Sequence, residues 1–344
     1  MMTRRSALVI LLKISLVTVY VIVLLVLLLL LAGCLVILYI AIGNRLFATT
    51  FYRKEPMPTV DRSPLEIDQS DVIGRGRNWF YTNRMEFLNV RVTAFDGVKL
   101  QGYYRPSFDR QCRNVVILLH GYNEHPSMVS AYAKLIMTKI QCHVLIIHQR
   151  AHCMSGGKYC SYGLCESVDL NSWIEFCKKQ AGPDIRIFIF GRCMGAVTAL
   201  LAAEQDGFSE NVAGIIADSP YDKFSRPLLD LGKRRYKVNL SIFYKWMKRC
   251  VALRFNFDID KCDCALGADR IKIPVLLFHG EKDHIVDPES SRQIYDRIRS
   301  PKRMVIIENA DHMESYIKAP SLYEKEVENF IEQCVIRLVK LGRM

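Results

Sequence analysis

The chain has 344 residues, of which 50% are hydrophobic, and its formal net charge is +12. This length allows one large domain with an appendage, and the apolar share exceeds what a soluble domain needs. The positive charge does not indicate a nucleic-acid partner, because the basic residues are spread along the chain and are densest only in one short run, Gly232–Lys237.

The excess of apolar residues lies near the amino terminus. No charged residue occurs from Ile14 to Asn44, and about 30 residues at about 1.5 Å each exceed the thickness of a bilayer core. A cleaved signal peptide is the alternative, but its apolar region usually has only about 7–15 residues. We therefore expect a tail at 1–13, a single-pass transmembrane anchor at 14–44 and a linker or juxtamembrane segment at 45–84.

The side of the membrane on which the domain lies is only weakly determined. Three cations precede the span and three follow it closely, so the positive-inside bias nearly cancels. The short, cationic amino-terminal tail favours an inside amino terminus and a translocated domain. Twelve cysteines would tend to pair in an oxidising compartment, so an exported domain requires either a reducing location or buried thiols.

From residue 85 onward, short apolar runs alternate with helix-like segments. Alternating stretches at Val90–Phe95 and Val98–Tyr104, separated by Asp96-Gly97, predict a hairpin that opens a sheet. Further strands are predicted at Val115–Leu119, Val144–Ile147, Ile185–Phe190, Val212–Ala217, Val275–Phe278 and Met304–Ile307. Helices are predicted at Val129–Lys139, Val168–Lys178, Met194–Glu204, Pro288–Arg299 and Tyr323–Leu341. This alternation indicates an α/β fold with a mostly parallel central sheet flanked by helices.

One segment interrupts the alternation. The connection between the strands that end at Ala217 and begin at Val275 is far longer than a helical crossover needs. We expect a small helical cap at 221–272 that roofs a substrate pocket, with extra packing against the body as the alternative. The basic run Gly232–Lys237 within it favours anionic lipid as a partner, with a solvated helix face as the alternative.

The strongest chemical signal is the sequence GRCMG at 191–195. It follows a predicted strand and precedes a helical run, which is the setting of a nucleophile elbow. Gly191 and Gly195 allow strand and helix to approach closely around a strained residue, here Cys193. The amino terminus of a helix favours the thiolate form of such a cysteine. A cysteine that merely packs in the core is the alternative.

A nucleophile needs a base and an orienting acid, and both are expected on loops after later strands. Asp283 follows the strand at 275–278 and His312 follows the strand at 304–307. The order Cys193, Asp283, His312 therefore fits a catalytic triad. The alternatives are His284 as the base and Asp218 or Asp311 as the acid.

An attacked carbonyl also needs fixed hydrogen-bond donors for its developing oxyanion. Two backbone N–H groups are placed to supply them, that of Met194 directly after the nucleophile and that of Tyr122 in the loop after the strand at 115–119. We expect His120 in that loop to have a structural role, in which it holds the loop by hydrogen bonds.

The sequence indicates no cofactor. Two clusters are candidate metal sites, His148, His152 and Cys153 in one and Cys262 and Cys264 in the other. Neither offers two well-spaced ligand pairs, so we expect no metal. The glycine motifs that bind nucleotides are also absent from the sequence.

Taken together, these motifs resemble the α/β-hydrolase superfamily, in particular membrane-anchored bacterial hydrolases similar to prolyl-oligopeptidase-like and cinnamoyl-esterase-like enzymes. The resemblance covers nearly everything after the linker. It is carried by TAFDGVKL (93–100), HGY (120–122), RAHCMSGG (150–157), GRCMGA (191–196), ADSPY (217–221), GEKDHIV (280–286) and ADHMES (310–315). It implies that Cys193 is the nucleophile, Asp283 the acid and His312 the base, with Tyr122 and Met194 as the oxyanion donors.

The chain departs from the family pattern at two places. The family usually reads RGHGxS where residues 150–155 read RAHCMS, and it usually has serine where this chain has Cys193. Dienelactone hydrolases are similar in placing a cysteine within the same glycine frame.

A thiolate leaves a tetrahedral intermediate more readily than an amine does, so esters, lactones and thioesters are favoured over peptides as substrates. The sequence thus predicts a membrane-anchored hydrolase that acts on a small-molecule or acyl substrate through an acyl-cysteine intermediate. One alternative is a catalytically inactive, membrane-tethered binding protein with the same fold. Another is peptidase or acyltransferase activity at the same site.

Overall fold

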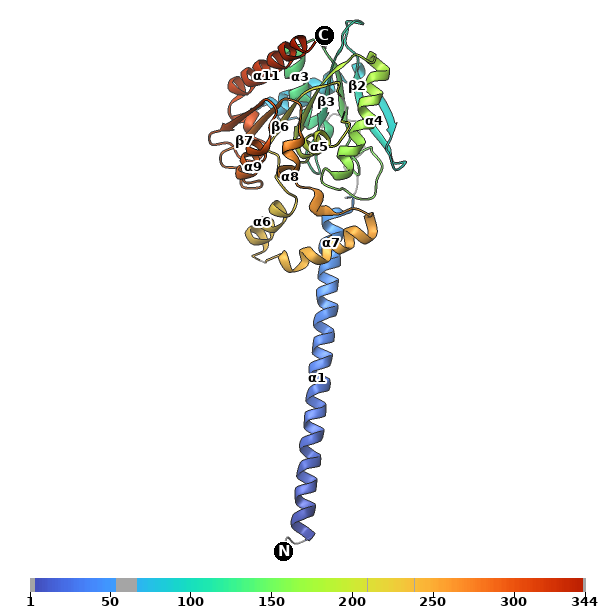
Figure 1. Cartoon of the computed structure of the whole chain (residues 1–344), viewed down its shortest axis with the longest axis vertical. Coiled ribbons are helices and arrows are strands. Elements are labelled where there is room, and N and C mark those ends of the chain that lie inside the picture. Colours follow the sequence, from blue (N-terminus) through green and yellow to red (C-terminus); the bar gives the residue numbers. More distant parts are fainter. Residues whose placement is uncertain (1–3, 54–66, 209, 238, 343–344) are drawn as a thin grey trace.

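The computed structural model describes residues 4–53, 67–208, 210–237 and 239–342. A long helix, α1 (Arg4–Phe51), stands apart for most of its length and enters a globular part at its carboxyl end (Figure 1). The globular part is built on a single eight-stranded sheet.

Helix α1 is long and apolar enough to cross a membrane, and the same features near an amino terminus are also found in signal sequences. Its mean hydropathy reaches 3.5 and its side chains are exposed over most of the apolar stretch. The last turns differ, because Phe47 and Phe51 are buried in the core of the globular part. Residues 45–51, which we expected in the linker, therefore continue the helix and pack with the domain.

The rest of the predicted linker segment is also partly helical. Helix α2 (Val72–Thr82) begins at Asp71, whose side chain accepts a hydrogen bond of 2.8 Å from the backbone N–H of Gly74. Ile73 and Phe80 are buried against the sheet layer. The prolines earlier in this segment suggested a linker, and Pro56, Pro58 and Pro64 all lie outside the described residues.

The strands follow the order β1-β2-β4-β3-β5-β6-β7-β8 across the sheet. The strands are β1 (Leu88–Thr93), β2 (Lys99–Arg105), β3 (Asn114–Leu119), β4 (His143–Ile147), β5 (Arg186–Arg192), β6 (Val212–Asp218), β7 (Val275–Gly280) and β8 (Lys302–Ile307). The β1–β2 and β2–β4 pairs are antiparallel and the other pairs are parallel. Every predicted strand is present, with its ends shifted by no more than two residues.

Helices cover both faces of the sheet, because its central strands are apolar on both sides. In β3, Val115 and Ile117 belong to the core on one face whereas Val116 and Leu118 belong to the core on the other. The first core is covered by α4 (Leu164–Ala181), α5 (Met194–Ala203) and α9 (Glu289–Arg297). The second is covered by α2, α3 (Ser130–Lys139) and α11 (Pro320–Lys340).

The segment expected as a cap contains three helices, α6 (Ser225–Tyr236), α7 (Ser241–Phe255) and α8 (Cys264–Gly267). Helices α6 and α7 lie at the end of the globular part from which α1 emerges (Figure 1). The hydroxyl of Tyr39 in α1 donates a 2.8 Å hydrogen bond to the carbonyl of Ile242, and its ring stacks on Phe243 at 5.2 Å. The cap therefore joins α1 to the body.

The remaining elements are short. They are α10 (Ser315–Lys318) and 3-10 turns at Arg84–Glu86, Pro126–Val129, Ile259–Lys261 and Ala268–Arg270.

Candidate active site

Cys193 lies in a strained turn between β5 and α5. Its backbone has φ 50° and ψ −115°, a conformation that residues with a side chain rarely adopt. The turn holds because the N–H of Cys193 donates a 2.8 Å hydrogen bond to the carbonyl of Asp218, at the end of β6. The sequence context thus produces the sharp elbow that it predicts.

The two glycines of the elbow are required by close backbone contacts. A Cβ atom at Gly191 would lie 2.3 Å from the carbonyl carbon of Gly195. A Cβ atom at Gly195 would lie 2.3 Å from the carbonyl oxygen of Leu119, at the end of β3. Only glycine allows α5 to begin this close to β3 and β5.

His312 and Asp283 come together although 29 residues separate them. Nδ1 of His312 lies 2.6 Å from Oδ2 of Asp283. The other oxygen of Asp283 accepts hydrogen bonds from the backbone N–H groups of Ile285 at 2.9 Å and Val286 at 2.8 Å. The carboxylate is therefore held in one orientation and leaves Nε2 of His312 for Cys193.

The surroundings of His312 favour its protonated form. Burial opposes protonation of His312, but the Cys193 and Asp283 charges and hydrogen bonds raise its pKa to about 10. Burial also opposes ionisation of Asp283, yet hydrogen bonds from His279 and His312 lower the pKa of this carboxyl. An anionic Asp283 then stabilises a protonated His312 beside the thiol.

The side chains of the other candidate base and acids bind partners outside the triad. Nδ1 of His284 pairs with Oδ2 of Asp311 at 2.5 Å, and His284 is mostly exposed. Asp218 is fully buried, and its carboxylate accepts hydrogen bonds from Ser219 at 2.9 Å and Tyr323 at 3.2 Å. Among the contacts of the described residues, these carboxylates are bound to partners other than the His312 ring.

The two expected oxyanion donors flank the elbow. Met194 is the first residue of α5, so its N–H has no acceptor within the helix. Tyr122 follows β3 in a turn that Glu124 closes by accepting a 2.7 Å hydrogen bond from the N–H of Gly121. Nε2 of His120 accepts a 3.1 Å hydrogen bond from the N–H of Gln149, which confirms that His120 holds this loop.

Arg192 and Glu124 are positioning residues that the sequence did not reveal. Arg192 is almost fully buried and lies 3.6 Å from Glu124. Its guanidinium also donates to the carbonyls of Met128 at 3.3 Å and Met313 at 3.4 Å. It thereby joins the elbow to the Tyr122 turn and to the His312 loop. A charged residue at the end of an apolar strand is the signal that could have indicated it.

A cavity of about 470 Å³ opens at Cys193. It is lined by Tyr122, Tyr162, Cys193, Tyr221, Phe224, Pro227, Leu228, Asp230, His284, Ile285 and Val286. Helix α6, in the segment expected as a cap, supplies Pro227 and Leu228 to this lining. The lining is mostly aromatic and aliphatic, which suits the acyl or aryl part of a substrate.

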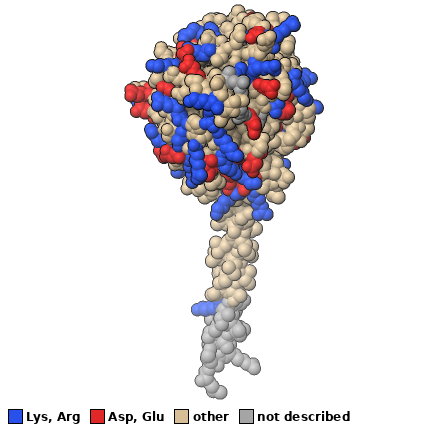
Figure 2. Space-filling model, turned by 45° about the horizontal axis from the view of Figure 1, so that its top comes forward, with Lys and Arg blue, Asp and Glu red and all other residues tan. Residues whose placement is uncertain are grey.

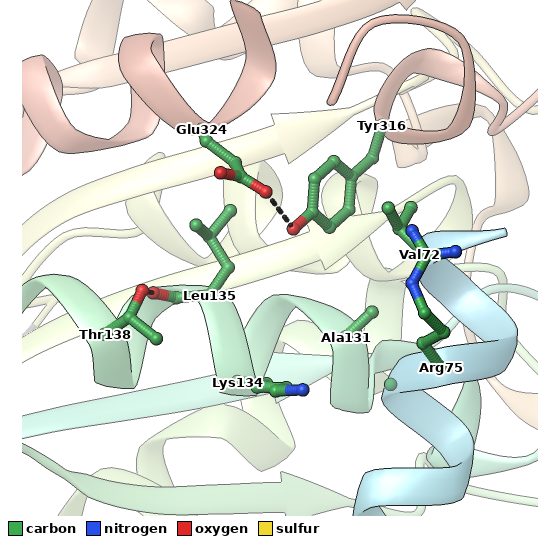
Figure 3. A pocket seen from close by; sticks show the side chains of 9 residues that line it. Val72, Arg75, Ala131, Lys134, Leu135, Thr138, Tyr316 and Glu324 are labelled. Atoms are coloured by element: carbon green, nitrogen blue, oxygen red, sulfur yellow. Dashed lines mark hydrogen bonds between the residues drawn. The ribbon is translucent and has the colours of Figure 1, made fainter. Parts of the chain in front are cut away.

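A second cavity, of about 240 Å³, lies between α2, α3 and α11 (Figure 3). The Tyr316 hydroxyl donates a 2.9 Å hydrogen bond to Glu324 across it, and Arg75 and Lys134 extend along its sides. Neither Cys193, Asp283 nor His312 contributes to its lining. The chemistry described above therefore belongs to the cavity at Cys193.

Within the described residues, no group of three or more His, Cys, Asp or Glu could hold a metal ion. In the two clusters weighed earlier, the thiol of Cys262 points to the carbonyl of Tyr162 at 3.1 Å and Nδ1 of His148 lies 3.4 Å from the N–H of Met154. All twelve cysteines are free thiols and nine of them are buried. Cys193, which is half-buried at the pocket, is thus available for reaction.

Comparison with known proteins matches residues 110–254 and 262–314 to the family described as serine aminopeptidase, S33. Among curated relatives, the uncharacterized protein YqkD of Bacillus subtilis is 30% identical over 249 residues, which are 72% of this chain and 80% of the relative. The α/β hydrolase domain-containing protein 17B of Homo sapiens is 20% identical, over 65% of this chain and 68% of its own length.

Solved structures confirm the α/β-hydrolase fold. The esterase Pf2001 of Pyrococcus furiosus superposes with a TM-score of 0.56 at 24% identity, over 72% of this chain and 92% of the esterase. Est1E from Butyrivibrio proteoclasticus, solved with bound ferulic acid, gives a TM-score of 0.55 at 17% identity, over 72% of this chain and 100% of Est1E. At these identities the likeness concerns the fold alone.

Proposed function

The chain belongs to the serine aminopeptidase, S33, family of α/β hydrolases, and we propose that Cys193 replaces the usual serine as the nucleophile of a Cys-His-Asp triad. The observation that carries this proposal is the convergence of a strained elbow cysteine, which lines the pocket, with a histidine that Asp283 orients and that hydrogen-bonds to Cys193. A protein without catalytic activity would not require this orientation of the His312 ring.

The reaction proceeds in two steps. The Cys193 thiolate attacks the substrate carbonyl carbon and forms a C–S bond, while the N–H groups of Tyr122 and Met194 stabilise the oxyanion. The tetrahedral intermediate expels the leaving group, which takes a proton from His312. His312 then removes a proton from water, the resulting hydroxide attacks the acyl-thioester, and the C–S bond breaks to restore Cys193.

The substrate class follows from the leaving groups. A phenoxide or thiolate competes well with the Cys193 sulfur for departure, and an alkoxide departs when His312 protonates it, whereas an amine is the poorest leaving group of the four. Esters, lactones and thioesters are therefore the proposed substrates, and the mostly apolar pocket accommodates an acyl or aryl group.

Helix α1 anchors the enzyme as a single membrane span in this proposal. Its apolar stretch exceeds a bilayer core, and its end packs into the domain at Phe47 and Phe51, which ties the span to the catalytic body. The tail favours a translocated domain, and the burial of nine thiols protects most of them from pairing there. Protease accessibility of the domain in intact cells tests on which side of the membrane the domain lies.

The full chain in detergent provides the test of the chemistry. We expect hydrolysis of short-chain aryl esters and thioesters, an initial burst from acyl-enzyme formation, and a covalent adduct on Cys193 by mass spectrometry. Cys193→Ala abolishes turnover and labelling, whereas the matched variant Cys165→Ala, which changes a half-buried thiol outside the pocket lining, retains both. A folded wild-type protein without burst or turnover would instead identify a binding protein.

A second candidate, an aminopeptidase, is favoured by one observation. Asp230 is the acidic residue of the cap helix α6 in the pocket lining, where a carboxylate could bind the free α-ammonium group of a peptide. Amino-acid aryl amides and aryl esters of simple carboxylic acids, which lack the α-ammonium group, separate the two functions. Cleavage of the amides that falls in Asp230→Asn, with ester cleavage unchanged, would establish the peptidase.

A further inference from the structure

We infer that helices α6 and α7 form a surface that binds anionic lipids. This surface places α6, which lines the pocket, in contact with the membrane. The inference rests on the proposal that α1 spans the bilayer. It adds to that proposal a second, peripheral contact between the protein and the membrane surface. The occupant of this surface is the headgroup layer of a membrane that contains acidic lipids.

Charge is the first observation. From Ser225 to Phe255 the sequence has nine Lys or Arg residues and one Asp, a net charge of +8 out of +12 for the whole chain. In Figure 2, Lys and Arg side chains gather at the base of the globular part, where the apolar shaft begins. A basic segment directly beside a membrane span is attracted to acidic lipid headgroups.

The pattern of exposure on α7 is the second observation. Ile242, Lys245, Arg249 and Leu253 follow one another at helical spacing, and all four are exposed, with Ile242 at 57% and Leu253 at 76%. The other side of the helix is buried, with Phe243, Met247, Cys250 and Val251 in the core. A face that combines exposed cations with exposed large apolar side chains is typical of helices that lie in the membrane interface.

The position of α7 along α1 is the third observation. Tyr39 of α1 contacts Phe243 and Trp246 of α7, with ring centroids 5.2 Å and 6.1 Å apart. Tyr39 lies one turn before Asn44, the polar end of the apolar stretch, and Tyr and Trp are enriched at this boundary between hydrocarbon and headgroups. Helix α7 therefore crosses α1 at the depth of the interface.

The pocket lies close to the same depth. The hydroxyls of Tyr162 and Tyr122, both in the pocket lining, donate to the carbonyl of Thr50 in the last turn of α1, at 2.7 Å and 3.4 Å. Thr50 is six residues beyond Asn44, which is about 9 Å along a helix. The headgroup layer is itself about 5–8 Å thick, so the pocket wall lies at its outer edge.

These observations favour lipid over a solvated face or a soluble partner. A solvated face would not need Ile242 and Leu253 exposed, and a soluble partner would have to compete with headgroups at the surface where α1 holds the cap. Because α6 supplies Pro227, Leu228 and Asp230 to the pocket, lipid contact also holds the roof of the site in place.

The experiment uses the full chain in lipid nanodiscs of phosphatidylcholine, with and without phosphatidylglycerol. Hydrogen–deuterium exchange measures residues 225–255. We expect about tenfold slower exchange in this segment when phosphatidylglycerol is present, and loss of the difference in high salt, because the attraction is electrostatic. This readout does not require catalytic activity, so it can fail or succeed independently of the proposed function.

The variant Lys245→Glu/Arg249→Glu should exchange equally fast in both lipids. The matched control Lys325→Glu/Lys340→Glu makes the same charge change on exposed sites of α11, at the far end of the globular part (Figure 1), and should behave as wild type. If the first variant unfolds, the salt dependence of exchange in the wild-type protein tests the inference by itself. Equal exchange of wild type in the two lipids, or a difference that persists in high salt, would overturn the inference.

Discussion

The hydroxyl of Tyr162 donates a 2.7 Å hydrogen bond to the backbone carbonyl of Thr50, 112 residues away in the last turn of α1. The final carbonyls of a helix lack partners within it, so this one is available to the pocket wall. Phe51, the next residue, contacts the rings of Tyr162 at 5.7 Å and Phe224 at 5.5 Å. The end of the apolar helix is thus part of the site's support.

Phe51→Ala in the full chain tests this support. Phe51 is 1% exposed, and removal of a buried phenyl ring lowers the free energy of unfolding by about 3–5 kcal/mol. Urea unfolding in detergent measures the loss, and ester hydrolysis should fall with it. Met85→Ala is the control, since Met85 is 95% exposed. Equal stability of the two variants would contradict a structural role for the end of α1.

Gly195→Ala tests the geometry of the elbow. The added methyl group would lie 2.3 Å from the Leu119 carbonyl oxygen, so the start of α5 must move, at a cost of about 1–3 kcal/mol. We expect loss of labelling at Cys193 and of ester hydrolysis in a chain that still folds. Gly33→Ala is the matched change, because a Cβ atom there meets nothing within 4 Å. Full activity of Gly195→Ala would refute the elbow.

Arg192→Met tests how the loops are held together. It leaves the Glu124 carboxylate, which is 3.6 Å from Arg192 and 13% exposed, without its cation, a change that costs at most about 3–5 kcal/mol. We expect kcat to fall more than KM rises, because the Tyr122 and His312 loops lose a common partner. Arg192→Met/Glu124→Gln should recover part of the stability in a double-mutant cycle, whereas strictly additive losses would show that the two residues act separately.

The pH dependence of stability tests the contact of His312 with Cys193. In the folded protein the pKa of His312 is raised from 6.5 to about 10, against the effect of burial, by Cys193 and Asp283. A raised pKa stabilises the fold fully below about pH 6.5, and this stabilisation is lost as the pH rises through about 10.

Part of that stabilisation comes from Cys193, so the stability difference between wild type and Cys193→Ala should shrink from about pH 6.5 to about pH 10. Urea unfolding at a series of pH values measures it. Met85→Ala, which changes an exposed side chain that does not titrate, should show no such trend relative to wild type. A difference that is constant or grows with pH would indicate that the thiol and the imidazole do not form a pair.

Local signals in the sequence predicted the sheet and most of the candidate site. Apolar runs such as Val115–Leu119 became strands because their length and burial on both faces suit only the interior of a parallel sheet. The glycines around Cys193 and the positions of Asp283 and His312 after strands placed all three at the same edge of that sheet. Chain order and strand ends were sufficient, because parallel strands bring their carboxyl ends together.

Contacts between distant segments were beyond the sequence alone. The pairing of Arg192 with Glu124, and of the end of α1 with Tyr162, depends on which loops meet in space, and no local pattern encodes that. The same holds for the border of the apolar helix. The sequence alone determined that Ile14–Asn44 is an uncharged, apolar stretch. Only tertiary packing decided that the helix continues to Phe51, because burial of two phenyl rings against the segment that contains α6 and α7 stabilises the added turns.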